Sequence, residues 1–534
     1  MQSWLSWFLR GVVIVSFLIL FSKLVEVQVI KGDYYRGLAE ENRIRHIPIP
    51  APRGKIVARG GEILAGNIDV KRRVKFLSQG GFEVTEDLTG ATEEEIITDY
   101  KRYYTLGPKF AHGLGYLGEV SAEEVEKIDP ECPEKGPRMS GALTGKVGLE
   151  QQYNCLLSGV PGEELIEVDT SGKKIRTLGK REPLPGQDLK TTIDFTMQTE
   201  AAKAMEGKKG AVVVSDAKGE ILAFYSGPSF DPNKIDTSLF TDPDLPFFDR
   251  VIGGVYHPGS VFKPLVAMSA LEEGKINKSY RFTDTGVLTV KTLYGDFSYS
   301  NWYFTQYGGV EGEIDLTRAI ARSTDTFFYT IGEMVGPEKI AFWANKFRLD
   351  QKTGIDLPGE ISGLIPTPEW KKKIKKESWF LGNTYHMSIG QGDVAVTPLG
   401  INTYISAIAA DGKLCKPHFA GEAECEQLNL EKENLELIKK GMTGVCSQGG
   451  TGYTFFDFAA KHDGIEVACK TGTAESSTDD TEPHAWFTFF LPAGAGGPPG
   501  IVATILVEKG GEGSKVAGPI ARQIADVWVL KNNP

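Results

Sequence analysis

The sequence is poor in the residues that most often bind transition metals. It holds 7 histidines and 6 cysteines among 534 residues, and no group of them has the spacing of zinc ligands. It also lacks a glycine-rich loop of the Walker type, which would cradle a phosphate group. These absences exclude the common zinc-binding and P-loop classes, and we expect the protein to use neither a metal nor a cofactor.

Basic residues are too few for a nucleic-acid-binding protein. Lysine and arginine together number 59 against 70 aspartates and glutamates, so the net charge is -11. A nucleic-acid site needs a concentration of positive charge, and we therefore exclude nucleic acid as a partner. The length exceeds that of one ordinary domain, and the hydrophobic content of 41% is enough for several large cores.

Long apolar runs are absent after residue 31, but one lies at the start of the chain. It extends from Trp4 to Leu24 and is interrupted by Arg10. No small-x-small cleavage site follows, so a signal peptide is a poor fit. The run is long enough to cross a bilayer core of about 30 Å, with Arg10 and Lys23 reaching the two interfaces. We expect a cytoplasmic tail at 1–10 and an uncleaved membrane anchor at 11–30, although flanking charges on both sides barely decide its orientation.

The even number of cysteines permits disulfides in an extracytoplasmic domain, but their pairing cannot be deduced from sequence alone. Cys415 and Cys425 are close enough in the chain to staple a short hairpin. Cys469 precedes Lys470, and side chains alternate along a strand, so its thiol should point away from that lysine. We therefore do not expect Cys469 to be a catalytic thiol.

A candidate nucleophile lies in the stretch from His257 to Pro264. Pro258 and Gly259 predict a turn, after which Ser260 can open a helix. Lys263 then shares a face with Ser260, so its amine can reach the serine hydroxyl. A serine needs an adjacent base, and a lysine serves as one only when burial or a nearby cation lowers its pKa. The apolar flanks predict a buried helix, but the tetrapeptide alone is far more often a helix start with a surface lysine.

Two further motifs change this interpretation. Ser323-Thr324-Asp325 lies about sixty residues on, and Lys470-Thr471-Gly472, followed by Thr473, comes much later. Penicillin-binding proteins and serine β-lactamases share a signature of three motifs in a fixed order: Ser-x-x-Lys, a Ser-x-Asn-like element and Lys-Thr-Gly. The chain resembles a class B penicillin-binding protein. A second Lys-Thr-Gly at residues 352–354 precedes a loop-like stretch, and we interpret it as a structural turn.

The resemblance extends over nearly the whole chain. Four stretches are similar to the pedestal of class B members: residues 52–56, 61–67, 111–116 and 145–150. His112 lies in the third stretch, and we interpret it as a packing residue far from the active site. The family implies an α+β fold: a single N-terminal transmembrane helix, an elongated β-rich, non-catalytic pedestal (dimerisation-like) at 31–190, and a transpeptidase domain at 191–534. That domain should hold a five-stranded antiparallel sheet flanked by helices.

Local patterns agree with this expectation. Apolar patterns predict strands at 210–216, 220–224, 484–490 and 501–507. They also predict helices at 197–205 and 519–530. The lysine cluster at 371–376 is expected to be a solvated surface.

The resemblance also implies a role for each site residue. Ser260 attacks the carbonyl of the penultimate D-Ala of a peptidoglycan stem peptide, and Lys263 accepts its proton. Ser323 bridges Lys263 and Lys470 and passes a proton to the leaving amine. The terminal carboxylate is recognised by a cation and hydroxyls, and two backbone N–H groups form an oxyanion hole. The substrate-binding residues are Lys470, Thr471, Gly472 and Thr473, and the oxyanion-hole residues are Ser260 and Thr473.

Asp325 departs from the usual asparagine of the second motif. An ionised aspartate cannot donate a hydrogen bond, and near two lysines it favours their charged forms. Within class B, Ser-x-Asp resembles the elongation-type enzymes, with the division type as the alternative. The resemblance implies D-Ala-D-Ala stem peptides and β-lactams as ligands, a SEDS-type glycan polymerase as partner, and an extracytoplasmic catalytic domain. A β-lactamase or carboxypeptidase, a β-lactam sensor and a non-catalytic scaffold remain open.

Overall fold

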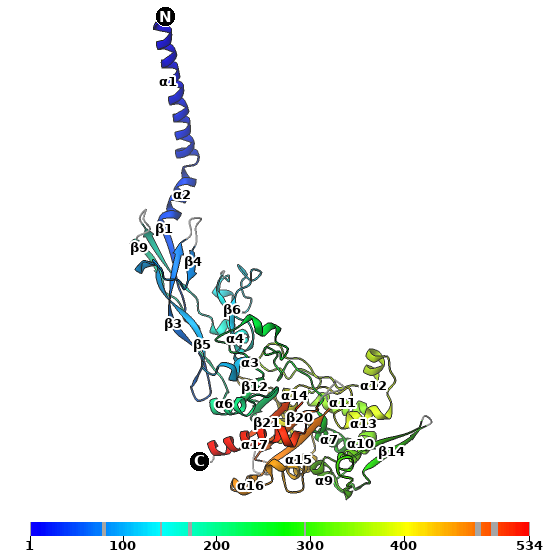
Figure 1. The fold of residues 1–534 in the computed structure, drawn as a ribbon. Helices are drawn as coiled ribbons and strands as arrows, with labels where there is room; N and C mark the ends of the chain where they lie inside the picture. The colour runs from blue at the N-terminus through cyan, green and yellow to red at the C-terminus, as the bar shows by residue number, and fades with distance from the viewer. Residues whose placement is uncertain are drawn as a thin grey trace. The chain divides into compact units, whose positions relative to one another are not determined.

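The structure is a computed structural model, and it describes residues 2–76, 82–138, 141–168, 174–292, 295–475, 482–492 and 500–532. The chain divides into two compact units. The first unit consists of residues 1–55, 66–103 and 155–187, and the second consists of residues 56–65, 104–154 and 188–534. Figure 1 shows the ribbon, with many of the helices and strands named below labelled.

The first unit contains the N-terminal helices and two small groups of strands. β1, β8 and β9 form an antiparallel sheet in the order β1-β8-β9, and β3 pairs with β4 and β5. Its elements are α1 (Gln2–Val25), η1 (Glu26–Ile30), α2 (Gly32–Arg43), β1 (Ile44–Ile49), most of β3 (Ile63–Phe76), β4 (Phe82–Thr85), η2 (Glu93–Glu95), β5 (Ile96–Tyr104), β8 (Gly162–Val168) and β9 (Lys174–Arg181). This composition confirms the expected β-rich pedestal.

α1 and η1 form the one candidate membrane span in the described part of the chain. The span covers Trp4–Ile30, 27 residues with a mean hydropathy of 2.2. Its apolar side chains do not pack against other elements; Phe17 and Leu20, for example, have exposed fractions of 69% and 65%. A helix that is apolar all round and unburied by protein suits the hydrocarbon core of a bilayer. The structure therefore confirms a helix that is long and apolar enough to span a membrane.

The second unit is built around a five-stranded antiparallel sheet in the order β12-β11-β21-β20-β19. Strands that are far apart in the sequence lie side by side in this sheet: Val213 of β11 is opposite Thr504 of β21. β11, β20 and β21 are buried at nearly every position, which explains their continuous apolar runs. The strands are β11 (Gly210–Ser215), β12 (Ile221–Gly227), β19 (Ala468–Ala474), β20 (His484–Leu491) and β21 (Ile501–Val507). The predicted five-stranded sheet is confirmed.

Three helices pack on this sheet: α6 (Phe195–Ala204), α14 (Pro398–Ala409) and α17 (Gly513–Asn532). α6 begins at Phe195, before the predicted start at Met197, because Asp194 caps it and accepts hydrogen bonds from the backbone N–H groups of Thr196 and Met197. All residues of α14 are buried, so this helix is covered on every side. These helices account for the flanking layers that the fold class implies.

A lobe of shorter helices adjoins β19, the edge strand of the sheet. α7 is central to this lobe, because it contacts α10, α11 and α15 and is buried from Lys263 to Leu271. The lobe comprises η6 (Gly259–Phe262), α7 (Lys263–Glu272), α8 (Trp302–Tyr307), α9 (Leu316–Arg322), α10 (Asp325–Val335), α11 (Pro337–Lys346), α13 (Leu381–Ser388) and α15 (Lys432–Cys446). Burial of α7 removes the lysine at its start from water.

Smaller elements complete the second unit. They are β2 (Ile56–Val57), η3 (Gly107–Phe110), α3 (Ala111–Leu114), β6 (Leu117–Glu119), η4 (Pro133–Lys135), β7 (Leu143–Gly145), α4 (Gly148–Gln152), β10 (Leu189–Lys190), η5 (Thr237–Thr241), β13 (Phe282–Asp284), β14 (Val287–Thr292), β15 (Gly295–Ser300), β16 (Gly312–Ile314), α12 (Pro368–Trp370), η7 (Lys371–Lys375), β17 (Lys413–Cys415), β18 (Cys425–Gln427), η8 (Tyr453–Phe455) and α16 (Phe458–Lys461). A short helix, α5 (Asn154–Leu157), lies where the chain passes from the second unit to the first.

Two local predictions differ from the structure. α17 begins at Gly513 rather than at Pro519, and Pro519 lies inside the helix. Pro519 is the seventh residue of α17, so it lacks the N–H that would donate to the Lys515 carbonyl, and the helix continues past it. Lys371 is not solvated: its exposed fraction is 7%, and it pairs with Glu377 at 3.3 Å. The π-helical turn η7 directs this one lysine inward while Lys372 and Lys373 stay exposed.

Candidate active site

Ser260 lies in the turn that leads into α7. Residues Gly259–Phe262 form a 3₁₀ turn, in which positions i and i+3 lie on the same side, so Ser260 and Lys263 share a face as predicted. The turn is held by a hydrogen bond of 2.9 Å from the Gly259 N–H to the carbonyl of Gly390. Among the described residues the hydroxyl of Ser260 has no hydrogen-bond partner, and the Lys263 amine is directed elsewhere.

Ser323 and Asp325 lie at a break between two helices. α9 ends at Arg322, Ser323 adopts a left-handed backbone conformation with φ 56°, and α10 begins at Asp325. Such a conformation is unfavourable for a residue other than glycine, and it often occurs at functional sites. Here it reverses the chain, so that the carbonyl and hydroxyl of Ser323 and the carboxylate of Asp325 all reach the same lysine.

That lysine is Lys263, which makes three hydrogen bonds. Its Nζ donates to the Ser323 carbonyl at 2.8 Å, to Ser323 Oγ at 3.1 Å and to Asp325 Oδ1 at 2.6 Å. Its side chain is fully buried. Burial lowers the pKa of Lys263, because the charged form loses its hydration, and the carboxylate of Asp325 opposes that shift. Burial and the Asp325 carboxylate therefore act on the protonation of Lys263 in opposite directions.

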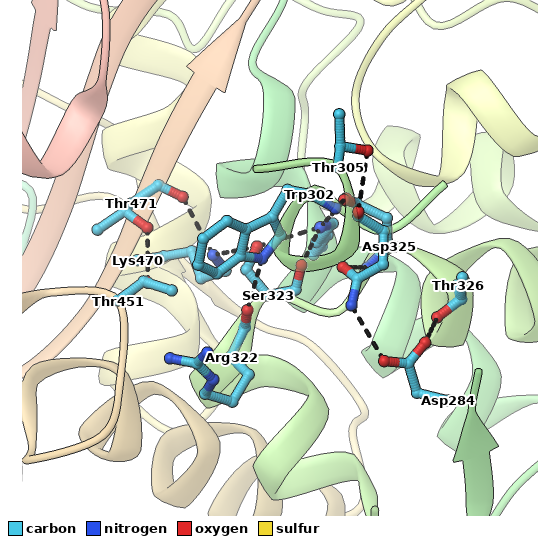
Figure 2. Close-up of polar contacts among 12 residues, drawn as sticks. Asp284, Trp302, Thr305, Arg322, Ser323, Asp325, Thr326, Thr451, Lys470 and Thr471 are labelled. Carbon is cyan, nitrogen blue, oxygen red and sulfur yellow. Dashed lines mark hydrogen bonds and ion pairs between the residues drawn. The ribbon is translucent and has the colours of Figure 1, made fainter. Parts of the chain in front are cut away.

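Lys470 reaches the same serine from the sheet. Its Nζ lies 3.0 Å from Ser323 Oγ and donates to the Thr471 carbonyl at 3.0 Å. It too is fully buried, and burial together with the neighbouring Lys263 holds its pKa well below the usual range for lysine. Figure 2 shows Ser323 and Lys470 with their contacts (Figure 2).

The Ser323 hydroxyl therefore lies between two buried amines, 3.1 Å from one and 3.0 Å from the other. A hydroxyl both donates and accepts hydrogen bonds, so it can transfer a proton from one amine to the other without moving. The arrangement can activate a serine nucleophile and return the proton to a leaving group, which are the two proton transfers that acyl transfer requires.

The Lys-Thr-Gly motif lies on the edge strand β19, against the turn that carries Ser260. A Cβ on Gly472 would lie 3.0 Å from the Pro258 carbonyl and 2.9 Å from Cβ of Trp486, so only glycine allows this approach. A Cβ on Gly259 would likewise lie 3.0 Å from the Thr473 carbonyl. The backbone of Thr473 is therefore next to the serine turn, where the predicted oxyanion hole requires it.

The two threonines of the motif have different surroundings. The hydroxyl of Thr471 is hydrogen-bonded to that of Thr451 at 2.8 Å, and it is largely buried (Figure 2). The hydroxyl of Thr473 accepts a hydrogen bond of 3.3 Å from the N–H of Gly513, and its side chain is exposed. Exposure of Thr473 leaves its hydroxyl accessible to a ligand.

The second Lys-Thr-Gly serves a different purpose. The Thr353 N–H and hydroxyl donate to one carboxylate oxygen of Glu360 at 2.7 and 2.6 Å, and the Gly354 N–H donates to the other at 3.0 Å. The tripeptide therefore folds around an acidic side chain of its own loop, which agrees with the interpretation as a structural turn.

Several residues around the site were not found from the sequence. Asn301 accepts from the Asp325 N–H at 3.2 Å, the Trp302 N–H donates to Asp325 Oδ2 at 2.9 Å, and Thr451 contacts Thr471. No spacing rule links these positions to the motifs, because they lie on loops or at the start of a short helix, and the position of these segments depends on the folded lobe. A lone asparagine or threonine carries no signal by itself.

Cys415 and Cys425, which are close enough in the chain to staple a hairpin, form a disulfide that joins β17 to β18. The sequence did not predict the pairing of Cys446 with Cys469, which joins the end of α15 to the strand that carries Lys470. None of the cysteines in the described residues is free. The sulfur of Cys469 is therefore used in a disulfide rather than as a thiol beside Lys470.

Comparisons with known proteins agree with this geometry. The penicillin binding protein transpeptidase domain matches residues 210–526, and the penicillin-binding protein dimerisation domain matches residues 82–191. The peptidoglycan D,D-transpeptidase MrdA of Acinetobacter baumannii is 31% identical to this chain, with 99% of this chain and 88% of the relative covered.

Two solved structures are similar over most of their length. PBP2 of Pseudomonas aeruginosa in complex with WCK 5153 superposes with a TM-score of 0.72 and 30% identity, covering 91% of this chain and 96% of that one. A chain from a peptidoglycan synthase complex that coordinates polymerization and crosslinking has a TM-score of 0.76 and 26% identity, covering 97% of each chain. The chain therefore belongs to the penicillin-binding protein transpeptidases, among the class B, elongation-type members related to MrdA.

Proposed function

We propose that the protein is a peptidoglycan D,D-transpeptidase that cross-links stem peptides through an acyl-enzyme on Ser260. The observation that carries the proposal is the pair of buried lysines, Lys263 and Lys470, joined through the Ser323 hydroxyl next to the serine turn. The relatives named peptidoglycan D,D-transpeptidase support the same reaction.

In the first step, Ser260 Oγ attacks the carbonyl carbon of the penultimate D-Ala. An ester bond to Ser260 forms, the D-Ala-D-Ala peptide bond breaks, and the terminal D-Ala leaves. Lys263 in its neutral form takes the hydroxyl proton. The proton reaches the leaving amine by way of the Ser323 hydroxyl, which lies within hydrogen-bond distance of both lysines.

In the second step, an amine of a neighbouring stem peptide attacks the ester. A new amide bond forms and Ser260 is regenerated with its proton. The two-step exchange keeps the energy of the broken amide bond in the ester, so no external energy source is needed. A carboxypeptidase would instead admit water at this step and release a shortened stem peptide.

Substrate recognition is assigned to β19. Lys470 supplies a cation, and the hydroxyls of Thr471 and Thr473 supply donors for the terminal carboxylate. Gly472 lets the strand approach the serine turn without a steric clash. The backbone N–H groups of Ser260 and Thr473 form the oxyanion hole for the tetrahedral intermediate. Asp325 completes the catalytic set as the charge partner of Lys263.

We further propose that residues 11–30 anchor the protein, with the tail at 1–10 in the cytoplasm and the catalytic domain outside. Residues 31–190 then form the pedestal, and residues 191–534 the transpeptidase domain. The match of the dimerisation-domain family up to residue 191 supports this division. We infer a SEDS-type glycan polymerase as the membrane partner; the similarity to a chain of a peptidoglycan synthase complex supports this.

Labelling with a fluorescent penicillin tests the acylation step. We expect the full-length protein to form a covalent adduct, and Ser260→Ala to form none. Ser269→Ala is the matched control, because Ser269 lies on the adjoining helix and its hydroxyl donates to the Leu265 carbonyl of that same helix. Labelling of Ser260→Ala, or no labelling of folded wild type, would overturn the proposal. A cross-linked dimer of stem peptides then distinguishes a transpeptidase from a carboxypeptidase, which yields only free D-Ala and shortened stems.

A further inference from the structure

Asp325 is held at two points by two consecutive residues. Its backbone N–H donates to Asn301 Oδ1 at 3.2 Å, and its carboxylate Oδ2 accepts from the Trp302 N–H at 2.9 Å. The other carboxylate oxygen, Oδ1, contacts Lys263 at 2.6 Å. The position of the carboxylate that faces Lys263 therefore depends on the short segment 301–302.

Asn301 also replaces a missing helix cap. The first N–H groups of α10 have no acceptor within the helix, and the N-cap residue, Thr324, makes no side-chain cap. The hydroxyl of Thr324 is buried and has no partner among the described residues. Asn301 supplies an acceptor from outside the helix, so it determines where α10 begins as well as where Asp325 points.

Asn301 is itself fixed by a buried carboxylate. It is fully buried, its Nδ2 donates to Asp284 Oδ2 at 3.2 Å, and its own N–H donates to the Gly286 carbonyl at 2.7 Å. Asp284 is only 1% exposed and accepts three further hydrogen bonds. The Thr326 hydroxyl donates to it at 2.7 Å (Figure 2), the Gly286 N–H at 3.0 Å and the Glu311 N–H at 2.9 Å. These donors are all uncharged, so Asp284 orients Asn301 without competing for Lys263.

We propose that Asn301 is a positioning residue for the acylation step: it holds Asp325 against Lys263, and Asp284 in turn holds Asn301. The inference rests on the proposed function, because Lys263 must serve as the base for Ser260. Neither residue touches the reacting atoms. Loss of the Asn301 side chain frees the start of α10, so the Asp325 carboxylate is no longer kept at 2.6 Å from the amine.

The consequence is measurable in the pH dependence of acylation. The charged groups that face Lys263 are Asp325 from α10 and Lys470 from β19. Asp325 favours the charged amine and Lys470 disfavours it. If Asp325 is displaced, the neutral amine forms at lower pH, and the acidic limb of the pH–rate profile moves to lower pH. A variant that is merely less stable loses active protein at every pH without moving this limb.

The experiment compares acylation rate constants of full-length Asn301→Ala and Asn402→Ala across pH. Asn402 is the matched control, because it is equally buried and also makes two side-chain hydrogen bonds, to the Ser215 hydroxyl at 2.7 Å and the Val502 carbonyl at 3.2 Å. We expect Asn301→Ala to be acylated about tenfold more slowly, as for loss of one buried hydrogen-bond partner, with the acidic limb shifted down. Asn402→Ala should keep the wild-type limb.

Asn301→Ser keeps a short acceptor, and we expect its rate constant to lie between those of wild type and Asn301→Ala. Equal rates and equal limbs for Asn301→Ala and Asn402→Ala would overturn the inference. So would loss of the thermal unfolding transition in both Asn301 variants, since the residue would then be needed for folding alone. If wild type is not labelled at Ser260, the proposed function fails first and the inference falls with it.

Discussion

Lys263 and Asp325 illustrate how a single side chain adjusts the chemistry of this site. Burial of Lys263 favours the neutral amine that can serve as a base, whereas Asp325 at 2.6 Å favours the ammonium. The asparagine that is usual in the second motif would have no such charge. We infer that Asp325 sets the pH at which the base becomes active rather than supplying a proton itself.

Asp325→Asn tests this role with almost no change of shape. The asparagine carbonyl still accepts from the Trp302 N–H or from Lys263, but the negative charge is lost. Because Asp325 raises the pKa of Lys263, its removal lowers that pKa, and the amine is neutral at lower pH. We expect the acidic limb of the acylation profile to shift downward by about one to two pH units. A limb that stays in place, or moves to higher pH, contradicts the assignment of Lys263 as the base.

His112 gives a prediction about stability instead of activity. Burial lowers the pKa of its ring from 6.5 to about 4, and its Nε2 has no partner among the described residues. The folded protein therefore resists protonation of His112, while the unfolded chain takes up a proton near pH 6.5. Its contribution to stability is complete above pH 6.5 and is lost as the pH falls towards 4.

We expect the free energy of unfolding of wild type, relative to His112→Phe, to fall by about 3 kcal/mol between pH 7 and pH 4. Denaturant unfolding of both proteins at several pH values measures this difference, and other titrating groups cancel in the comparison. A difference that does not change with pH would show that His112 is accessible to protons in the folded state.

At the scale of elements, the site depends on how α15 is attached to β19. The disulfide between Cys446 and Cys469 joins them one residue before Lys470. The loop that follows α15 packs on this disulfide, since a Cβ on Gly452 would lie 2.9 Å from the Cys469 sulfur. The same loop carries Thr451, which contacts Thr471 at 2.8 Å. The disulfide therefore supports both the strand and the loop that contacts it.

We expect the double variant Cys446→Ala, Cys469→Ala to lose about 2–4 kcal/mol of stability and to be acylated several-fold more slowly. The matched control removes Cys415 and Cys425, whose disulfide closes a β17–β18 hairpin. The control should lose some stability but keep the acylation rate within about twofold. Equal effects of the two double variants on the rate would show that the Cys446–Cys469 link does not support the site.

At the scale of the whole molecule, the catalytic groups and the membrane helix lie in different units. All the residues assigned to catalysis belong to the second unit, whereas α1 belongs to the first. The helix is not buried by other parts of its own unit. We therefore expect the helix to attach the protein to a membrane and to leave the chemistry of the site unchanged.

Deletion of residues 1–30 should release the protein from lipid vesicles and keep the rate of penicillin acylation within about twofold, because no site residue is removed. The comparison protein carries Leu18→Arg, which keeps the length but places a charge in the span, at a cost of about 2.5–3.5 kcal/mol on insertion scales. Flotation of vesicles measures binding. A truncated protein that stays bound to vesicles would contradict the role of this helix in membrane binding. A truncated protein that is folded but no longer acylated would contradict the independence of the site from the helix.

Much of the architecture could be predicted because its signals are local. The apolar run from Trp4, the order of the three motifs and the buried strand of residues 501–507 are each contained in a short window. Cys415 and Cys425 could be recognised as close enough for a hairpin disulfide because their sequence separation is only 10. In each case the nearby residues suffice to specify the structure, since local geometry leaves few alternatives.

The sequence by itself therefore determined the family, the fold class, the membrane helix and the identity of the candidate site residues. Only the tertiary structure decided that the Ser323 hydroxyl lies between Lys263 and Lys470, that Asn301 holds Asp325, and that Cys446 pairs with Cys469. It also decided that residues 104–154 belong to the second unit. The physical reason is the same for all of these. Contacts between residues far apart in the chain depend on how the lobe packs against the sheet, and that packing has no signature in the spacing of residues along the chain.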